Sequence, residues 1–263
     1  MIVERIWVGN PLRNFNYLLA CPESGDALAI DPLDHQQVLA VARDRGWNIT
    51  QILNTHEHHD HIGGNAAVAA ATGARVIAHR LARGRIPDVD QGVGAGDVIR
   101  VGKTVELECL DTPGHTLSHI CLLAHAEQPA LFSGDTLFNA GAGNVRNGGD
   151  VHALYRTFVD QLLRLPANTR VFPGHDYIEN NLAFTLSREP GNGDAAALLE
   201  RVRGHDPARA PVTTLAQEMK HNSFFRLDQT RIIAGLRRNF PDLPEQPDPE
   251  TVFIKLRDLR DRW

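Results

Sequence analysis

Residues 55–61 read THEHHDH and follow the apolar stretch ITQIL of residues 49–53. Four histidines in seven residues form a dense cluster in a chain that has 13 histidines among 263 residues. The apolar stretch predicts a buried strand, because it is short and is bounded by polar residues. The histidine cluster therefore follows the end of a strand, where it is either an ordinary polar loop or a metal site.

The spacing within this loop predicts ligands for two metal ions. His56 and His58 are two residues apart, so both rings point to the same side of an extended segment. Asp60 and His61 follow where GGN begins a helix, so the chain turns there and presents a second pair nearby. Imidazole and carboxylate groups are ligands for zinc, iron and manganese. The zinc-protease motif HExxH is excluded, because Asp60 stands where its second histidine would be.

Three further segments place a histidine or an aspartate in a tight turn after an apolar run. His115 lies in DTPGHT, Asp135 lies in SGDT, and His175 lies in FPGHD. Taken singly, a histidine at a strand end or an aspartate in a turn is ordinary. Together with the loop of residues 55–61, these segments supply enough ligands for two coordination spheres. The sequence therefore predicts a two-metal site.

Short apolar runs alternate with helical segments over the first two-thirds of the chain. NYLLA, ALAID, ARVIAH and HICLLAH have the pattern of strands, whereas QQVLAVARDRG and GGNAAVAAATGA have the pattern of helices. From about residue 176, helical periodicity replaces strands, as in YIENNLAFTLSRE and QTRIIAGLRRNF. We predict an α/β catalytic domain of layered sheets and helices over residues 1–175 and an α-helical substrate-binding region over residues 176–263.

Composition narrows the possible function. The net charge of −5, with acids and bases interspersed, gives no basic stripe, so we expect no nucleic-acid partner. The three cysteines are widely spaced and fit neither a disulfide framework nor a cysteine zinc site. The first residues, MIVERIWVGNPL, lack the apolar core of a secretory signal, and no run approaches the roughly 18 apolar residues of a membrane span. We expect a cytoplasmic protein without a membrane partner; the sequence does not indicate its oligomeric state.

The motifs THEHHDH, TPGHT, SGDT and PGHDY, in this order, resemble the metallo-β-lactamase superfamily. The helical C-terminal region and the ending KLRDLRDRW are most similar to glyoxalase II, the hydroxyacylglutathione hydrolases. This resemblance implies an αββα sandwich with a helical C-terminal region. It also implies one metal held by His56, His58 and His115 and a second held by Asp60, His61 and His175, with Asp135 bridging the two.

The resemblance also implies a chemistry. Two divalent metals, zinc first and iron or manganese as alternatives, would lower the pKa of a bridging water, and Asp135 and Asp60 would be catalytic as ligands. The hypothesis is that this bridging hydroxide attacks the thioester of an S-2-hydroxyacylglutathione such as S-D-lactoylglutathione. The products would be a 2-hydroxy acid and glutathione. No serine or cysteine nucleophile is required.

Residues for the thiol carrier are also implied by the resemblance. Basic residues near the C-terminus and the tyrosine after the GH motif lie beside glutathione in the family, which points to Arg257, Arg260 and Tyr177. An ordinary amphipathic helix with solvated arginines is the alternative for the two arginines. This chain departs from the family after LFNAGAG: Asn144 and Arg146 fall where a basic and an aromatic residue are usual, so Arg146 is a candidate replacement contact.

Two more residues are candidates for orienting the metal ligands. His119, in HTLSH, is expected to contact a ligand ring, since metal-bound imidazoles usually donate their other N–H to a neighbour. Asp31, at the end of ALAID, is either such an acceptor or a plain turn residue before Pro32.

Other functions within the same superfamily remain as alternatives. A persulfide dioxygenase would use one iron held by two histidines and an aspartate, although such proteins are typically shorter. A lactonase or β-lactamase would use the same hydroxide on esters or amides. A non-catalytic metal-binding protein is disfavoured, because every expected ligand is present.

Overall fold

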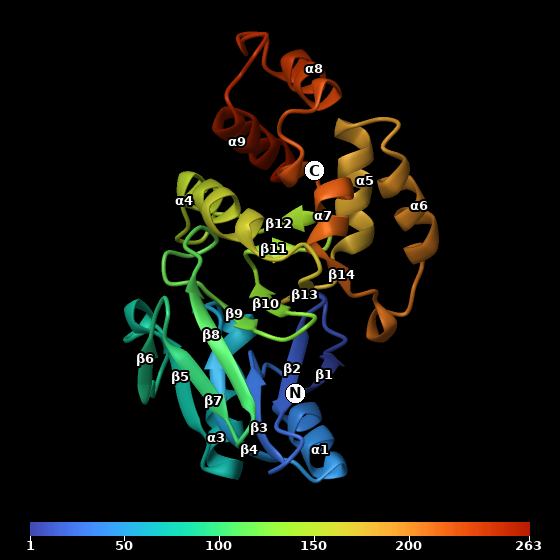
Figure 1. The fold of residues 1–263 in the computed structure, drawn as a ribbon. Coiled ribbons are helices and arrows are strands. Elements are labelled where there is room, and N and C mark those ends of the chain that lie inside the picture. Colours follow the sequence, from blue (N-terminus) through green and yellow to red (C-terminus); the bar gives the residue numbers. More distant parts are fainter.

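The computed structural model describes residues 1–263, and two six-stranded sheets form its centre (Figure 1). The first sheet has the strand order of its sequence and consists of β1 (Ile2–Trp7), β2 (Phe15–Ala20), β3 (Asp26–Ile30), β4 (Asn48–Asn54), β5 (Arg75–His79) and β6 (Gln91–Val93). Its first three strands pair antiparallel, whereas β3 to β6 pair parallel. The carboxyl ends of β3, β4 and β5 therefore meet at one edge.

The second sheet has the order β14-β13-β10-β9-β8-β7. Its strands are β7 (Val98–Val101), β8 (Val105–Asp111), β9 (Ile120–Ala124), β10 (Ala130–Gly134), β13 (Arg170–Pro173) and β14 (Thr213–Thr214). Only β10 and β13 pair parallel, and all other neighbours pair antiparallel. A small hairpin of β11 (Leu137–Phe138) and β12 (Gly141–Ala142) follows β10.

The main core lies between the two sheets, and alternation along the strands builds it. Leu28 and Ile30 of β3 belong to this inner cluster, together with Leu122 of β9 and Phe132 of β10. Ala29, between the two inner residues of β3, instead faces the helices on the outside of the first sheet. Successive side chains of a strand point to opposite faces, so a strand covered on both sides is apolar throughout.

Helices cover both outer faces and complete the predicted αββα sandwich. Val38 of α1 (His35–Arg45) and Val68 of α3 (Asn65–Thr72) pack on the first sheet. Both helices end at a glycine in the left-handed conformation, Gly46 and Gly73, which accepts that geometry without a Cβ clash. A third, very short helix, α2 (His59–Ile62), lies within the histidine loop.

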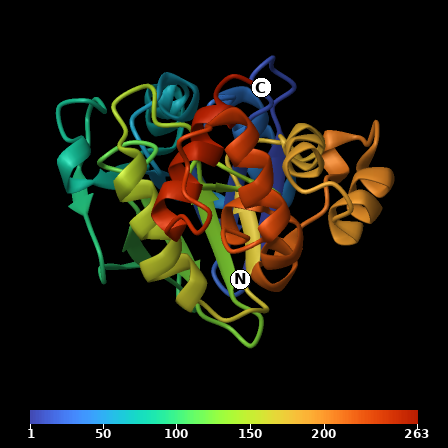
Figure 2. The ribbon, with the colours of Figure 1, turned by 90° about the horizontal axis from the view of Figure 1, so that it is seen from above.

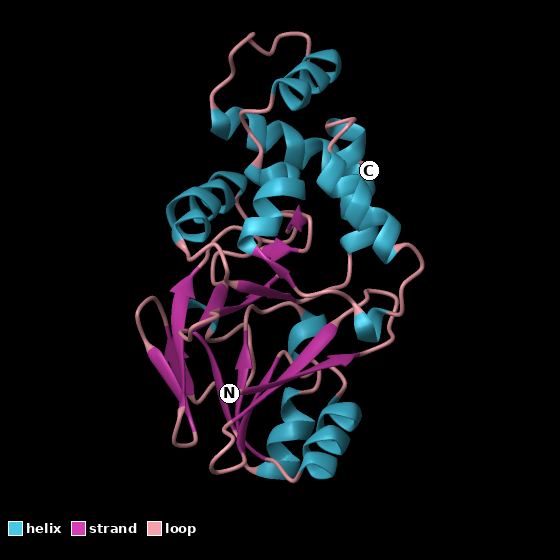
Figure 3. Cartoon of the chain, turned by 45° about the vertical axis from the view of Figure 1, so that its right-hand side comes forward, coloured by secondary structure: helices cyan, strands magenta, loops and turns pink.

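The second sheet is covered by α4 (Val151–Arg156), its π-helical continuation η2 (Thr157–Gln161) and the C-terminal helices. These helices are α5 (Ile178–Arg188), α6 (Gly193–Val202), α7 (Leu215–His221), α8 (Thr230–Asn239) and α9 (Pro249–Arg260). Short 3-10 turns lie between them at Pro207–Arg209 and Ser223–Phe225, and two more lie earlier in the chain at Arg80–Ala82 and Leu162–Arg164. Figure 3 shows the C-terminal helices gathered at one end of the molecule, opposite α1 and α3. Figure 2, seen from the end of the C-terminal helices, shows them lying over the strands. No helix combines the length and apolar character needed to cross a bilayer.

The C-terminal helices share a core with the second sheet. Phe224 and Phe253, from the region after residue 176, lie in one buried cluster with Leu131 and Val171 of the sheet. The two-residue strand β14 even adds an edge to this sheet from within the helical region. The sequence patterns predicted neither this strand nor α4. The division at residue 175 remains a prediction, and the packing ties the two parts closely together.

Candidate metal centre

Seven side chains meet at the edge where several strands of both sheets end. The loop after β4 and the short α2 provide four of them, and the turns after β8, β10 and β13 provide one each. These seven are the predicted His56, His58, Asp60, His61, His115, Asp135 and His175. Their ligand atoms form groups that could hold a metal ion, all within 4.8 Å of one another in each group. Residues up to 119 positions apart in the chain, from His56 to His175, thus converge, and their role as ligands stays a prediction.

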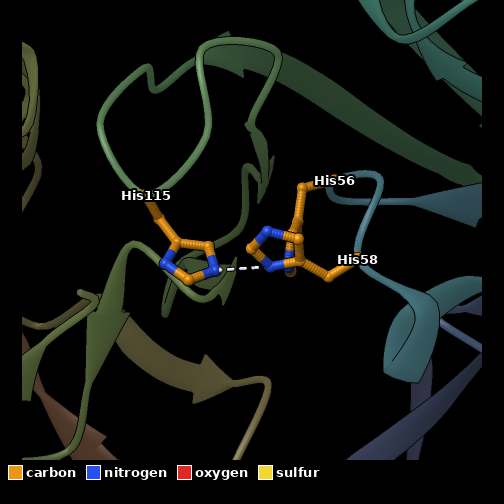
Figure 4. A group of neighbouring side chains, drawn as sticks. All are labelled: His56, His58 and His115. Atoms are coloured by element: carbon orange, nitrogen blue, oxygen red, sulfur yellow. Dashed lines mark hydrogen bonds between the residues drawn. The ribbon is translucent and has the colours of Figure 1, made fainter. Parts of the chain in front are cut away.

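The first half-site consists of His56, His58 and His115 (Figure 4). His56 Nε2 lies 3.0 Å from His58 Nδ1, and His115 Nε2 lies 2.9 Å from that same Nδ1. The two contacts converge on one atom, so three ring nitrogens face a common point. A neutral imidazole offers one lone pair, which makes this group a set of three uncharged donors.

The second half-site consists of Asp60, His61 and His175. The Nε2 atoms of its two histidines are 3.2 Å apart, and the Asp60 Oδ2 atom lies 3.6 Å from His61 Nε2 and 3.5 Å from His175 Nε2. This half-site therefore includes a carboxylate, which the first half-site lacks.

Asp135 lies between the two half-sites. Its Oδ2 atom is 3.5 Å from His115 Nε2 and 3.2 Å from His175 Nε2, and its Oδ1 atom is 3.4 Å from His61 Nε2. Oδ1 is buried and receives no hydrogen bond. A buried carboxylate oxygen without a partner is costly, and a cation would satisfy it. The donor set thus fits a pair of divalent metal ions.

The outward nitrogen of each histidine ring meets a hydrogen-bond acceptor. His115 Nδ1 donates to the Asn144 carbonyl (2.6 Å), and His58 Nε2 lies 3.2 Å from the Asn147 carbonyl. His175 Nδ1 donates to the Leu12 carbonyl at 2.7 Å. A ring that donates from one nitrogen presents its other nitrogen as a lone pair, so these contacts fix the tautomers needed for metal binding.

Asp31 supports rings in both half-sites. His61 Nδ1 donates to its Oδ2 at 2.9 Å, and the Thr55 hydroxyl donates to the same oxygen at 2.7 Å. Thr55 Oγ1 is in turn 3.0 Å from His56 Nδ1 and accepts from it. Asp31 adopts a left-handed φ of 49°, which aspartate tolerates better than most residues. Asp31 therefore accepts a hydrogen bond from a ligand candidate, which is the first of the two alternatives for this residue.

His119 contacts a ligand candidate by stacking, whereas its hydrogen bonds go to other groups. Its Nε2 accepts from the backbone N–H of Asp135 at 3.1 Å, and its Nδ1 lies 2.8 Å from the Thr112 hydroxyl. The ring stacks on His56 with centroids 5.2 Å apart. His119 thus holds the Asp135 turn through the backbone. His59, the remaining histidine of the loop, is exposed and belongs to none of the ligand groups.

The two half-sites differ in their proton affinity. Burial and the neighbouring His61 hold the pKa of His56 well below its ordinary value. Burial would also lower the pKa of His61, but Asp135, Asp31 and Asp60 outweigh it and raise that pKa to about 9. For Asp135 itself, burial raises the pKa, and the surrounding histidines, His175 first, outweigh this effect and hold it well below the ordinary range.

All five predicted carrier-binding residues line one pocket of about 250 Å³: Asn144, Arg146, Tyr177, Arg257 and Arg260. The pocket adjoins the metal-ligand cluster, because the Tyr177 ring stacks on His175 with centroids 4.9 Å apart. A larger cleft of about 870 Å³ lies between α6 and α7 and contains none of the predicted site residues. Of the two, the smaller pocket is thus the one with a direct contact to the ligand cluster.

The three arginines of this pocket differ in how far their guanidinium groups are already occupied by contacts within the protein. Arg257 is only 4% exposed, and its guanidinium donates to the carbonyls of Ala142 and Gly143 and to Asp261. Burial lowers the pKa of Arg257 to about 10. Arg260 donates to the Asn181 amide oxygen at 3.0 Å, whereas Arg146 is more exposed and contacts the Asp261 carbonyl. The solvated-arginine alternative therefore does not describe Arg257.

Sequence patterns alone missed the loop between β1 and β2. The Asn14 side chain donates to Asp60, and the Leu12 carbonyl accepts from His175. Asn14 lies between Arg13 and Phe15 in the sequence, and nothing in this context identifies a partner 46 positions away.

Comparison with known proteins agrees with this architecture. Residues 10–175 match the family model described as the metallo-beta-lactamase superfamily, and residues 176–263 match that of the hydroxyacylglutathione hydrolase C-terminus. Among solved structures, ETHE1 from Myxococcus xanthus matches with a TM-score of 0.66 at 25% identity, covering 99% of this chain and 98% of that one. TTHA1623, crystallised in a di-iron-bound form, matches with a TM-score of 0.61 at 27% identity over 84% of this chain and 98% of its own.

Full-length relatives narrow the family further. A hydroxyacylglutathione hydrolase from Polaromonas sp. (strain JS666 / ATCC BAA-500) is 71% identical over 263 residues, with complete coverage of both chains. One from Nitrosococcus oceani is 60% identical over the same span, again covering all of both chains. The chain therefore belongs to the metallo-β-lactamase superfamily and, within it, to the hydroxyacylglutathione hydrolases.

Proposed function

We propose that this protein hydrolyses the thioester bond of S-2-hydroxyacylglutathione, with S-D-lactoylglutathione as the type substrate. The products are a 2-hydroxy acid and glutathione. The observation that carries the proposal is the convergence of seven metal-ligand candidates in a chain whose full-length relatives are hydroxyacylglutathione hydrolases. A cytoplasmic location is part of the proposal, and cell fractionation would test it.

Two divalent metal ions fit the centre, with zinc as the first candidate and iron or manganese as alternatives. His56, His58 and His115 would hold one ion, Asp60, His61 and His175 the other, and Asp135 would contact both. When bound, such a pair supplies Lewis acidity and a water of lowered pKa, which together favour hydrolysis of an acyl bond. The di-iron-bound form of the similar TTHA1623 supports a pair rather than a single ion.

The chain itself contributes charge and orientation. The two carboxylates, Asp60 and Asp135, would only partly neutralise two divalent cations, so a loaded centre would stay positively charged and favour an anionic transition state. The outer contacts of the histidine rings, such as that of His61 with Asp31, hold each ring so that its inner nitrogen faces the centre before any ion binds.

A protein nucleophile is not needed, and the cysteines are poorly suited to that role. Cys21, Cys109 and Cys121 are all buried and free. Burial raises the pKa of Cys109 and of Cys121 to about 12, so neither thiol forms a thiolate at neutral pH. The hydrogen bond to Thr104 lowers the pKa of Cys21, but Cys21 follows the end of β2 opposite to Phe15, which is the end beside the site. We therefore assign the attack to water.

The glutathione moiety would occupy the pocket of about 250 Å³ beside Tyr177. Arg260 is our first candidate for a carboxylate contact, because its guanidinium is held only by Asn181 at the pocket wall. Arg257 already donates to two backbone carbonyls, so we assign it to stabilising the pocket wall rather than to binding the ligand. Arg146 and Asn144 complete the pocket, and they distinguish this chain from the usual family pattern.

The test is hydrolysis of S-D-lactoylglutathione by the purified chain loaded with zinc, iron or manganese. We expect turnover that depends on metal, and Arg260→Ala should raise KM about tenfold with little change in kcat, since a charged hydrogen bond contributes roughly 1.5–3 kcal/mol. Parallel assays with a lactone, a β-lactam and glutathione persulfide under oxygen address the other chemistries. Absence of thioester turnover with every metal would refute the proposal.

A further inference from the structure

The loop between β1 and β2, residues 8–14, reaches from the first sheet to the end of β13 in the second sheet. The Phe15 amide donates to the Gly174 carbonyl at 2.8 Å, and the Asp176 amide donates to the Arg13 carbonyl at 3.0 Å. Asn14 and His175 form an isolated antiparallel bridge between these two hydrogen bonds. We call residues 8–14 the bridging loop, because its backbone joins the two layers beside the second half-site.

Asn14 of this loop faces Asp60 directly. Its Nδ2 donates both to the Asp60 carbonyl and to Asp60 Oδ2, each at 3.0 Å. The Oδ1 atom of Asn14 accepts from Asn10 Nδ2 at 2.8 Å, and the backbone N–H of Asn14 donates to Asn10 Oδ1 at 3.0 Å. Only the amide nitrogen can face a carboxylate favourably, so this network sets the orientation of the Asn14 side chain. Asn14 is 1% exposed, which makes the network a buried one.

The Asp60 carboxylate has few other restraints. It lies on α2, a helix of only four residues, and its side chain is 22% exposed. Apart from the histidine rings of the centre, Asn14 supplies the one hydrogen bond that this carboxylate receives. Without the amide, the Asp60 side chain would be free to rotate towards solvent, since three staggered χ1 rotamers are normally available.

The same loop also fixes the histidine from the second sheet. The Leu12 carbonyl accepts from His175 Nδ1 at 2.7 Å and from the Tyr177 hydroxyl at 2.9 Å. Arg13, between Leu12 and Asn14, adopts a left-handed φ of 63°, a conformation that arginine rarely takes. Its side chain is tied to Asp176, which holds this turn in place.

The first half-site has no contact of this kind with the bridging loop. Its rings His58 and His115 are held by the carbonyls of Asn147 and Asn144, on the segment after β12. We infer that Asn14 is a positioning residue for the second half-site: its amide holds the Asp60 carboxylate in the direction of His61 and His175, so that the second metal ion binds tightly. This inference rests on the proposed two-metal function.

Metal titration of the metal-free chain tests the inference. Zn²⁺ is added in competition with a chromophoric chelator to the native chain and to Asn14→Leu, which keeps the side-chain size but removes the donor. We expect two tight equivalents for the native chain. In Asn14→Leu, one equivalent should bind within about threefold of the native affinity and the other about 10- to 100-fold more weakly, as for other residues that orient a metal ligand.

Asn222→Leu is the matched control. Asn222 is also buried, and its Nδ2 also donates to one carbonyl, of Gly141, and to one carboxylate oxygen, of Glu218. Because it lies away from the metal centre, its loss should lower the melting temperature but leave both zinc affinities within about threefold of native. A comparable loss of the second equivalent in Asn222→Leu would mean that general loosening, and not Asn14, weakens the site, and would overturn the inference.

The remaining outcomes separate the inference from the proposed function. Two tight equivalents in Asn14→Leu, as in the native chain, would overturn the inference alone. Fewer than two equivalents in the native chain would overturn the two-metal function as well. If Asn14→Leu does not fold, Asn14→Ala decides, since truncation also removes the donor and leaves the loop backbone unchanged; the same weakening is expected.

Discussion

The two half-sites take their ligand candidates from the same elements of the fold, but the charges of these ligands differ. Each takes two side chains from the loop after β4 and one from a turn of the second sheet. The first contains three imidazoles, and the pKa values of His56 and His115 are both lowered, foremost by burial. The second contains a carboxylate and His61, whose pKa is raised to about 9. At neutral pH His56 and His115 are thus uncharged and ready to bind, whereas the carboxylate of the second half-site attracts a cation but His61 must first release a proton.

Asp135 faces both half-sites, so its removal should have the largest effect. We expect Asp135→Ala to lower kcat for the thioester about 1,000-fold, because a shared ligand positions both ions and these contribute several kcal/mol to the transition state. The measurement compares Asp135→Ala with the native chain at equal metal content. Similar rates for the two would rule out a mechanism that needs both ions.

Single-ligand variants should separate the half-sites. His58→Ala and Asp60→Ala should each keep one tight zinc equivalent and bind the other about 100-fold more weakly, since each ligand of a zinc site contributes roughly 3 kcal/mol. Elemental analysis after dialysis against a chelator gives the metal-to-protein ratio. A variant that loses both equivalents together would show that the half-sites are energetically one unit.

The pH dependence of metal binding should also differ. Below about pH 9 the metal-free chain holds a proton on His61, because its pKa is raised, and a metal ion must displace it. Affinity at the second half-site should therefore rise about tenfold per pH unit from near pH 7 until about pH 9 and then level. The first half-site should be flat above neutrality, because the pKa of His56 is lowered. Calorimetry in buffers of different ionisation enthalpy counts the released proton, and equal slopes for both would contradict the assignment.

Asp31→Asn should have the smallest effect. Asparagine keeps the left-handed backbone and an acceptor for His61 Nδ1, but it removes the charge that raises the pKa of this ring. We expect the second zinc affinity to fall about tenfold above pH 9, where zinc has no His61 proton to displace in either protein, and this is the low end for residues that contact a metal ligand from outside. The first affinity should change less, since Asp31 reaches His56 only through Thr55. Competition with a chelator at fixed pH gives both values.

Local patterns predicted the fold class and the convergence of the seven ligand candidates. Each candidate sits directly after an apolar strand, and strand ends of layered α/β proteins meet at common edges. The turn glycines and prolines beside His115, Asp135 and His175 made these positions visible in the sequence. The C-terminal helices were likewise readable, because their apolar periodicity is strong.

The rest depended on contacts that no local pattern encodes. The bond from Asn14 to Asp60 joins residues 46 positions apart, and the Leu12 carbonyl leaves no trace in a side-chain pattern. The same limit applies to Arg257: the resemblance pointed to it together with Arg260, but its burial follows from packing against Phe224 and the carbonyls near β12. His119 was expected to contact a ligand ring and does stack on His56, but no local pattern encodes the hydrogen bond that its ring accepts from the backbone amide of Asp135.

The shared origin of the ligands has a further consequence for the cell. Each half-site takes ligands from both layers of the sandwich, so an ion bound there would cross-link the two layers. Binding to the folded chain alone stabilises it by mass action. In cells short of metal, the metal-free protein should therefore be degraded faster by proteases. The supply of metal would then determine the amount of this enzyme in the cell.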